Sequence, residues 1–395
     1  MQFYKDTKPW KLSGDIVSVV DENDHLGLVV SGSEEEQKNV DLKIQQCRNS
    51  VFGLLGAGYA YKCLLSPIVQ AHLWKTYNLP VLLSGLHVLP IRPTNISPMS
   101  VFQNKIFRGF LKLSKSSPVN SLYFLLGQLP VEAQLHINIF TIFHNIWNNP
   151  ETTIFQLVSY ILKMCATSST TWCNHLLILA ARYGLPSPLK LLEEEPPWTK
   201  SAWTCLVKTN ITVYFENKMR AESLTNSKMS LLNVQLLSLS GPPHPALLNI
   251  HTTQDVKRLR PHLKFLTGDY PHGVTMSHNQ SNISSACKLC DNAVDSTEHV
   301  LSVCRATADC RQRIYPELMN IVARVQPTSQ LLVQHTSEQL TQFITDCTSI
   351  NLPNSIRIPA HNPGISDIFR VARDWCYALH NERSRLLIKK KKQQK

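Results

Sequence analysis

The stretch Cys287-Lys-Leu-Cys290, followed by His299 and Cys304, organises the C-terminal part of this chain. A C-x₂-C turn supplies two thiolates to one ion, and zinc favours four sulfur or nitrogen ligands in a tetrahedron. His299 and Cys304 are five positions apart, and on a helical turn we expect both side chains to face the same point. The spacing therefore predicts a closed Cys₃His zinc site, which leaves no open position for a catalytic water.

Two alternatives to this ligand set follow from the same stretch. The four residues could lie near one another by chance, because the chain contains 11 Cys and 15 His. Cys310 is close enough in sequence to replace Cys304, and His278 is a more remote substitute ligand. Neither sits at so regular a spacing, so the set of four remains the prediction.

Composition indicates a basic protein of more than one domain. The 395 residues include 40 Lys and Arg against 28 Asp and Glu, which gives a formal charge of +12. A chain of this length holds two or three domains with real cores. The positive balance favours a polyanionic partner, RNA or DNA, although a basic housekeeping domain would carry the same charge.

Cysteine usage and hydropathy bear on the compartment. Eleven cysteines without a signal peptide or a regular framework are typical of a reducing, intracellular environment. Apolar runs such as residues 176–181 are much shorter than the roughly 20 residues that span a bilayer. We therefore expect an intracellular protein without a membrane segment.

Periodicity predicts a mainly α fold. Partial alternation between residues 12 and 31 indicates two short strands, 16–20 and 26–30, with a turn at 21–24. From Glu34 onward the pattern is helical, because apolar residues recur every three or four positions. The helical stretches include 34–55, 99–113, 131–146 and 198–219, and proline-rich breaks follow residues 185 and 240.

Short motifs along the chain suggest a family. They are residues 25–29, 66–67, 72–77, 79–85, 102–108, 126–136, 266–270, 296–301, 373–377 and 381–383. Together with Cys287, Cys290 and Cys304 they resemble the C-terminal region of LINE-type (non-LTR) retrotransposon reverse transcriptases. The segment 25–29 resembles the short box that closes the palm of those polymerases, and 66–85 resembles the entry to their thumb.

The resemblance implies an arrangement of domains. Residual palm strands would occupy 1–33, a thumb-like helical domain 34–150, a helical linker domain 151–240 and a zinc-binding domain 241–382. A basic tail, 383–395, would follow, and we expect it to be disordered because its like charges repel one another. The tail could also serve as a nuclear import signal.

The acidic residues that such a polymerase needs are not in place. The family holds two Mg²⁺ ions with clustered aspartates, two of them in an Asp-Asp box ahead of the palm-closing box. This sequence has no Asp-Asp pair, and Asp15, Asp21 and Asp24 suit solvated loop positions. We therefore expect no polymerase activity from the chain alone, and a separate protein could carry the missing palm.

Basic residues recur where nucleic acid would lie in a thumb and beside a zinc module. A phosphate backbone is held by such cations without sequence being read. Solvated helix faces would show the same pattern. The candidates are Lys43, Arg48 and Lys62, then Lys105, Arg108, Lys112 and Lys115, then Lys257, Arg258, Arg260 and Lys264, with His262 among the last group.

Three hypotheses on function follow. The first is a non-catalytic part of an RNA-directed DNA polymerase that holds template RNA or target DNA through thumb helices and the zinc knuckle. The second is a polymerase component that becomes competent with a palm from another chain. The third is a structural or interaction remnant, domesticated or pseudogene-like, whose zinc site only stabilises the fold.

Overall fold

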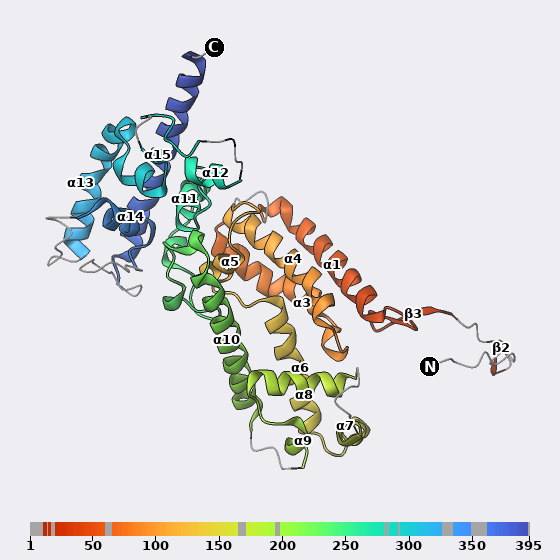
Figure 1. Cartoon of the computed structure of the whole chain (residues 1–395). Coiled ribbons are helices and arrows are strands. Elements are labelled where there is room, and N and C mark those ends of the chain that lie inside the picture. Colours follow the sequence, from red (N-terminus) through yellow and green to blue (C-terminus); the bar gives the residue numbers. More distant parts are fainter. Residues whose placement is uncertain are drawn as a thin grey trace.

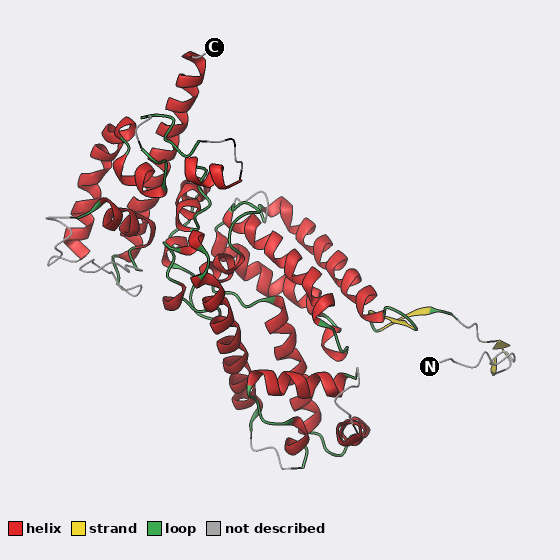
Figure 2. Ribbon diagram, in the orientation of Figure 1, coloured by secondary structure: helices red, strands yellow, loops and turns green. Residues whose placement is uncertain are grey.

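Helices make up most of the protein. The computed structural model describes residues 11–13, 15–16, 20–59, 65–164, 171–193, 198–279, 282, 284–290, 293–325, 335–348 and 362–393. Figure 2 shows that strands are confined to the N-terminal end and that helices and their connecting loops account for the rest. The predicted fold class, mainly α with an N-terminal hairpin, is confirmed, whereas its division into palm and thumb stays a prediction.

Two short antiparallel hairpins precede the helices. One pairs β1 (Lys11–Leu12) with β2 (Asp15–Ile16), and the other pairs β3 (Glu22–His25) with β4 (Leu28–Ser31). The second hairpin turns at Leu26 and Gly27, whose φ angles are 51° and 77°, as a tight two-residue turn requires. The predicted turn at 21–24 is therefore wrong, because the positive φ angles fall two positions later, although Asp21 and Asp24 are solvent-exposed as expected.

The second hairpin is fastened to α1 (Glu35–Leu54) by two side chains. Asn39 accepts a hydrogen bond from the Val29 amide at 2.8 Å and donates to the Val29 carbonyl at 2.7 Å, as a neighbouring strand would. Lys43 Nζ donates to the Gly27 carbonyl at 2.8 Å. Burial lowers the pKa of Lys43. Lys43 is thus a structural residue, and its predicted phosphate contact is wrong.

The helices of the first lobe surround one large apolar core. They are α1, α2 (Pro67–Leu73), α3 (Leu79–Leu83), α4 (Pro93–Leu111), α5 (Val119–Leu126), α6 (Val131–Trp147), α7 (Thr153–Met164), α8 (Trp172–Tyr183), α9 (Pro188–Leu191) and α10 (Lys200–Leu224). The predicted helices at 34–55, 131–146 and 198–219 correspond to α1, α6 and α10. The helix predicted at 99–113 begins earlier, at Pro93, because proline suits the first turn of a helix.

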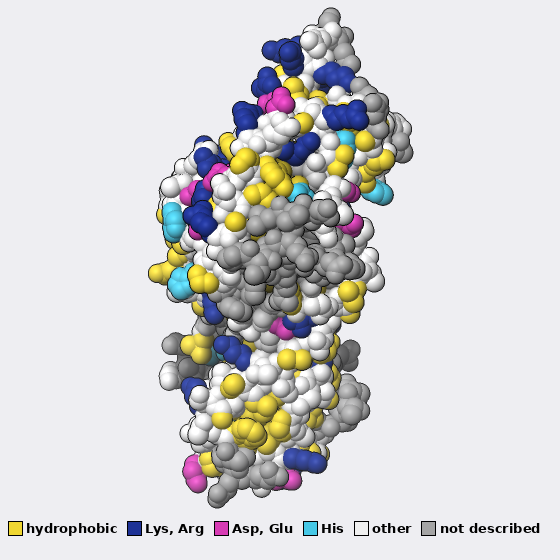
Figure 3. All heavy atoms as spheres, turned by 90° about the vertical axis from the view of Figure 1, so that its left-hand side faces the viewer, with side chains coloured by type: hydrophobic (Ala, Val, Ile, Leu, Met, Phe, Trp, Pro, Cys, Tyr) yellow, Lys and Arg dark blue, Asp and Glu magenta, His cyan; other side chains and the backbone are white. Residues whose placement is uncertain are grey.

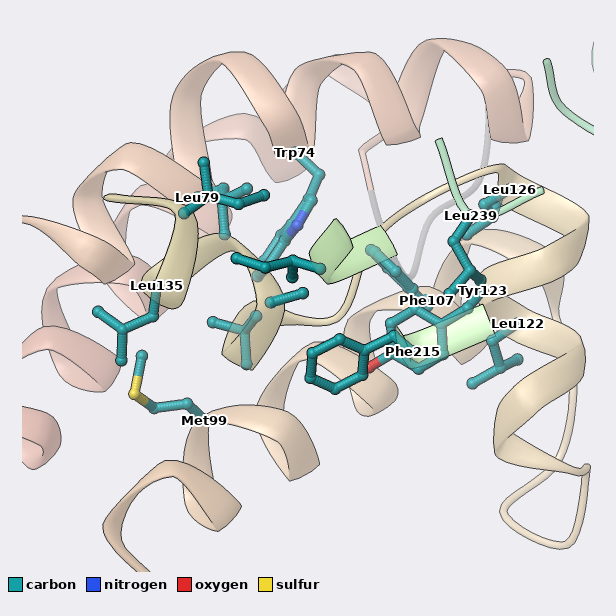
Figure 4. Close-up of a cluster of buried hydrophobic side chains, with 14 of the residues drawn as sticks. Trp74, Leu79, Met99, Phe107, Leu122, Tyr123, Leu126, Leu135, Phe215 and Leu239 are labelled. Carbon is teal, nitrogen blue, oxygen red and sulfur yellow. The ribbon is translucent and has the colours of Figure 1, made fainter. Parts of the chain in front are cut away.

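Aromatic side chains from distant segments meet in this core. Trp74 lies edge-on to Phe107 with ring centroids 5.7 Å apart, and Phe107 contacts Tyr123 in the same way at 5.4 Å. Figure 4 shows these rings between the helices, together with Phe215 of α10. Trp203 of α10 donates its indole N–H to the carbonyl of Phe140 on α6 at 3.0 Å. Residues 200–224 therefore share a core with the segment 34–150.

A second core lies in the C-terminal lobe. It forms among α11 (Thr253–Leu266), α13 (Ala308–Val325), α14 (Ser337–Asp346) and α15 (Ile365–Gln393), beside the short helix α12 (Gly273–Asn279). Helix α11 contributes to both cores, with Leu259 and Leu263 in the first and Phe265 in the second. In Figure 1, α11 accordingly lies between the two lobes.

One carboxylate also joins the lobes. Asp269, after α11, accepts hydrogen bonds from Ser114, Ser116 and Ser117 in the loop between α4 and α5, at 2.7 to 2.8 Å from the three hydroxyls. Burial opposes its charge, but the serine hydrogen bonds outweigh burial and lower the pKa of Asp269. The α4–α5 loop is thereby held against the C-terminal lobe.

The lysine-rich end of the chain is helical. Helix α15 continues to Gln393 without interruption, so the expectation of a disordered tail is wrong for residues 383–393. Arg383 is buried, and the side chain of Lys390 donates to the carbonyl of Lys288 at 2.7 Å. These contacts hold the helix where charge repulsion alone would unfold it. Residues 394 and 395 lie outside the described residues.

Candidate metal centre

Backbone hydrogen bonds fix the conformation of the Cys287–Cys290 turn. The Cys287 amide donates to the Ala293 carbonyl at 2.9 Å, and an isolated bridge pairs Ala286 with Val294. Backbone amides of Leu289 and Cys290 point at the Cys287 sulfur; burial alone would raise the pKa of this thiol, but these amides bring it below its ordinary value. The turn is thus arranged to hold a thiolate, which is the form that binds metal.

A π-helical turn brings the second pair of ligands together. The Cys304 amide donates to the His299 carbonyl at 2.7 Å, across the turn His299–Val303. On an α-helix, residues five apart would point about 140° away from each other. A π-turn closes its hydrogen bond over five residues, so both side chains return to one face. The predicted pairing is confirmed, but an ordinary helical turn could not have produced it.

The ligand atoms lie close together, and two of their separations match a tetrahedral zinc site. All lie within 4.8 Å of one another. The sulfurs of Cys287 and Cys304 are 3.9 Å apart, and the Cys290 sulfur is 3.4 Å from His299 Nε2. Zinc bond lengths predict about 3.8 Å between two sulfurs and about 3.6 Å between sulfur and nitrogen. The sulfur pair is also far too long for a disulfide, whose bond is about 2.05 Å.

The histidine and the last cysteine are buried, as the ligands of a closed metal site usually are. Burial lowers the pKa of His299, which favours the neutral imidazole that coordinates metal. Burial raises the pKa of Cys304 to about 11, although the Ala306 amide opposes that effect. Cys304 would therefore lose its proton on metal binding, as coordinating thiols do. Four protein ligands leave no position for water, and the site suits a structural ion.

Arg383 and Asp295 form a second layer around these ligands. Arg383 Nη2 lies 2.5 Å from Asp295 Oδ2, and its Nη1 lies 4.0 Å from the Cys287 sulfur. Burial opposes charge on Arg383, but Asp295 outweighs it and raises the arginine pKa. Three thiolates and a bound Zn²⁺ would carry an excess negative charge, and this guanidinium, which is also paired with Asp295, would lie beside it. The sequence predicts Arg383 at the start of a basic tail and indicates no role for it at the metal.

Gly273, the first residue of α12, packs against Asp295 beside the metal ligands. Its amide donates to Asp295 Oδ2 at 2.6 Å. A Cβ atom at Gly273 would meet the Ser285 carbonyl oxygen at 2.7 Å and the Asp295 Cβ at 2.8 Å. Only glycine allows the backbone so close. No periodicity in the sequence signals this requirement.

The two alternative ligands do not take part. Cys310 is buried in the C-terminal core, and His278 is exposed on α12. Across the described residues, Cys287, Cys290, His299 and Cys304 form the one group of three or more ligands that could share an ion. The predicted set is therefore the set that the fold assembles.

The predicted nucleic-acid contacts on α11 are only partly available. Arg258 Nη1 pairs with Asp374 of α15 at 2.9 Å. His262 is fully buried, donates from Nε2 to the Thr345 carbonyl at 2.8 Å, and has its pKa lowered to about 4 by burial. The carbonyl can only accept, so His262 Nε2 carries the proton. Lys257 is exposed, whereas Arg260 and Lys264 are half-buried. His262 is a core residue, and its predicted surface role is wrong.

The predicted contacts on α4 also differ in exposure. Lys105 and Lys115 are exposed, and Lys112 is half-buried at the left-handed end of α4. Arg108 donates to the Ser117 carbonyl at 3.2 Å and helps to hold the α4–α5 loop. Lys62 lies outside the described residues. Of the four predicted cations from Lys105 to Lys115, Lys105 and Lys115 are thus the two at the surface.

A groove between α1 and α4 brings together basic and exposed apolar side chains from two separate helices. Its volume is about 610 Å³, and Arg48 of α1 and Lys105 of α4 both line it. Phe52 and Val101 lie at the same groove and are 53% and 64% exposed. Cations beside exposed apolar side chains are the elements of a single-strand-binding surface. Helical periodicity alone does not predict that these two helices lie side by side.

Comparison of the chain with protein-family models, with curated proteins and with solved structures found no match. Within the described residues, no helix combines the length and the apolar character needed to cross a membrane. Figure 3 shows Lys and Arg side chains gathered toward the upper end of the molecule, where α15 ends.

Proposed function

We propose that this chain is a non-catalytic, nucleic-acid-binding part of a LINE-type RNA-directed DNA polymerase. The α1–α4 groove, with Arg48 and Lys105 beside exposed Phe52, is the observation that carries the proposal. Two cations track phosphates, and an exposed aromatic ring stacks on an unpaired base. Template RNA or target DNA would lie in this groove, as it does along the thumb of the polymerases that the sequence resembles.

The zinc site would keep a second surface in place. It joins the metal segment to α15 through Arg383, and α15 packs along α11, which carries exposed Lys257. The end of α15 adds exposed Lys389, Lys391 and Lys392, which also suit a nuclear import signal. In this proposal zinc does no chemistry and supplies rigidity to a basic surface.

A catalytic role is left to another polypeptide. In the described part of the chain, no three carboxylates come together in a possible metal site. Asp21 and Asp24 lie exposed on the β3–β4 hairpin. Two-metal phosphoryl transfer needs converging carboxylates, so a partner that carries a palm would supply polymerisation.

The groove is tested by charge reversal. The double variant Arg48→Glu, Lys105→Glu should weaken binding of a single-stranded RNA and of a primer-template duplex at least tenfold. It should also reduce the slope of log affinity against log salt by about one to two, because each phosphate contact releases counterions. The double variant Lys163→Glu, Lys208→Glu, on exposed lysines of α7 and α10 outside the groove, is the control matched in charge. Equal affinity for the double variant and the control would contradict the proposal.

A structural or interaction role without nucleic acid is the second candidate. The closed set of four ligands, three of them buried, favours it because such sites hold small modules folded. A chain that binds one zinc ion but shows no salt-dependent affinity for RNA or DNA would identify this role. Loss of RNA binding on zinc chelation would favour the first proposal.

A further inference from the structure

A pocket far from the metal centre lies among α6, α8 and the segment that enters α4. Its volume is about 260 Å³. Ile91, Pro93 and Ile178 supply apolar walls, and His136 and His175 contribute ring nitrogens. Pockets for drug-sized molecules begin at about 300 Å³. This pocket is therefore suited to a single small ring system.

His136 presents an unused polar atom to this pocket. Its ring is 1% exposed, and its Nδ1 lies 2.6 Å from the Tyr183 hydroxyl. Its Nε2 has no hydrogen-bond partner among the described residues. The His175 ring meets the His136 ring edge-on at 6.0 Å, and His175 Nδ1 is likewise without a described partner. Buried polar atoms of this kind normally have a partner.

His136 Nδ1 and the Tyr183 hydroxyl share one hydrogen bond, in which either group can be the donor. His136 Nε2 is the ring nitrogen left for a ligand: it donates when Nδ1 accepts from the hydroxyl, and it accepts when Nδ1 donates. Burial, with His175 and Arg182 nearby, lowers the pKa of His136 to about 3, so the ring is neutral at physiological pH.

The charged residues at the pocket are already paired. Arg92 lies 3.2 Å from Glu36, and Arg182 lies 3.6 Å from Glu132. Each positive charge thus has a carboxylate beside it. A phosphate or carboxylate ligand would find no free cation here and would have to lose its hydration against apolar walls.

We propose that this pocket binds one uncharged, planar heterocycle of nucleobase size, with a polar atom of its ring edge hydrogen-bonded to His136 Nε2. Its faces would pack against Ile91 and Ile178. Flipped bases are held in the same way, by apolar contact with their faces and hydrogen bonds to their edge. Two sources share this chemistry, a free nucleoside and an unpaired base of a bound strand. Only the second source rests on the proposed function.

The test uses the fluorescent base analogue 2-aminopurine, first as its riboside and then inside a single-stranded oligonucleotide. Ile178→Glu places a charge on the pocket wall. Val213→Glu is the matched control, because Ile178 and Val213 are 47% and 48% exposed on their helices and Val213 does not line the pocket. Binding changes the emission of 2-aminopurine. We expect at least tenfold weaker binding for Ile178→Glu and unchanged binding for Val213→Glu.

Two further measurements separate the possible outcomes. His136→Phe keeps an aromatic ring and removes the hydrogen-bonding nitrogen, and it should weaken binding as Ile178→Glu does, with its melting curve as the folding check. Anisotropy of an end-labelled strand reports total strand binding independently of the pocket. A strand that still binds while neither probe changes emission would overturn the pocket and leave the proposed function standing. A riboside response that disappears only in the pocket variants, with no strand binding, would support the pocket and contradict the proposed function. An equal response in Ile178→Glu and Val213→Glu would overturn the pocket.

Discussion

Arg383 near the end of α15 is paired with Asp295, which lies between the two halves of the metal site. Their closest atoms are 2.5 Å apart across 88 positions of sequence, and both side chains are almost fully buried. The same guanidinium reaches the Cys287 sulfur at 4.0 Å. The metal site and the terminal helix are therefore joined by one buried ion pair.

Removing the arginine charge should destabilise this unit strongly. Arg383→Gln leaves Asp295 buried without its cation, and breaking a buried pair in this way costs about 3–5 kcal/mol. Urea unfolding of the zinc-loaded protein measures the change. Arg385→Gln is the control, because Arg385 pairs with Glu382 on the surface of the same helix. Equal stability of the two variants would show that the buried pair contributes nothing.

Substitution of a ligand cysteine should release the metal. Cys287→Ser or Cys290→Ser removes a thiolate from the set of four, and we expect elemental analysis to fall from one zinc per chain to nearly none. Metal binding is coupled to folding in such sites, so the melting temperature of the C-terminal lobe should also fall. Cys205→Ser, on exposed Cys205 of α10, should keep both values. Full zinc content in the ligand variants would exclude this site.

A methyl group at Gly273 should disturb the pair of Asp295 and Arg383 without touching a metal ligand. Gly273→Ala forces a Cβ against the Ser285 carbonyl and Asp295, and overpacking of this kind costs about 1–3 kcal/mol. Gly53→Ala is the control, since nothing lies within 4 Å of a Cβ there. In a helix that change should be neutral or stabilising by up to about 1 kcal/mol. Comparable unfolding curves for both variants would contradict the close approach at Gly273.

The Asp269 network should make part of the stability depend on pH. The folded pKa of Asp269 lies below its unfolded value, so its contribution is complete above the unfolded pKa of about 3.9 and is lost as pH falls through the folded pKa. Asp269→Asn should cost about 2–3 kcal/mol at pH 7, because hydrogen bonds to a charged group are lost. The gap between wild type and variant should shrink at pH 3, and a gap that is constant with pH would contradict the assignment. Asp367→Asn, on an exposed residue, is the control.

Local sequence patterns predicted much of the helical architecture. Apolar residues such as Val40 and Cys47 recur at helical spacing because they face one core, and this periodicity predicted α1, α6 and α10. Lys43 occupies the same helix and looks like a surface cation in sequence. Its burial depends on the Gly27 carbonyl of a hairpin, which no local pattern reveals.

The metal ligands show the same division. Sequence alone determined which residues could hold an ion, because ligand chemistry is local: a C-x₂-C turn brings two thiolates together wherever it folds, and His299 and Cys304 follow closely. Only the tertiary structure decided how they meet. The π-turn overrides the α-helical phase of His299 and Cys304, and Arg383 reaches both Asp295 and the Cys287 sulfur from far along the chain. Both effects depend on long-range packing and charge balance, which no short stretch of residues encodes.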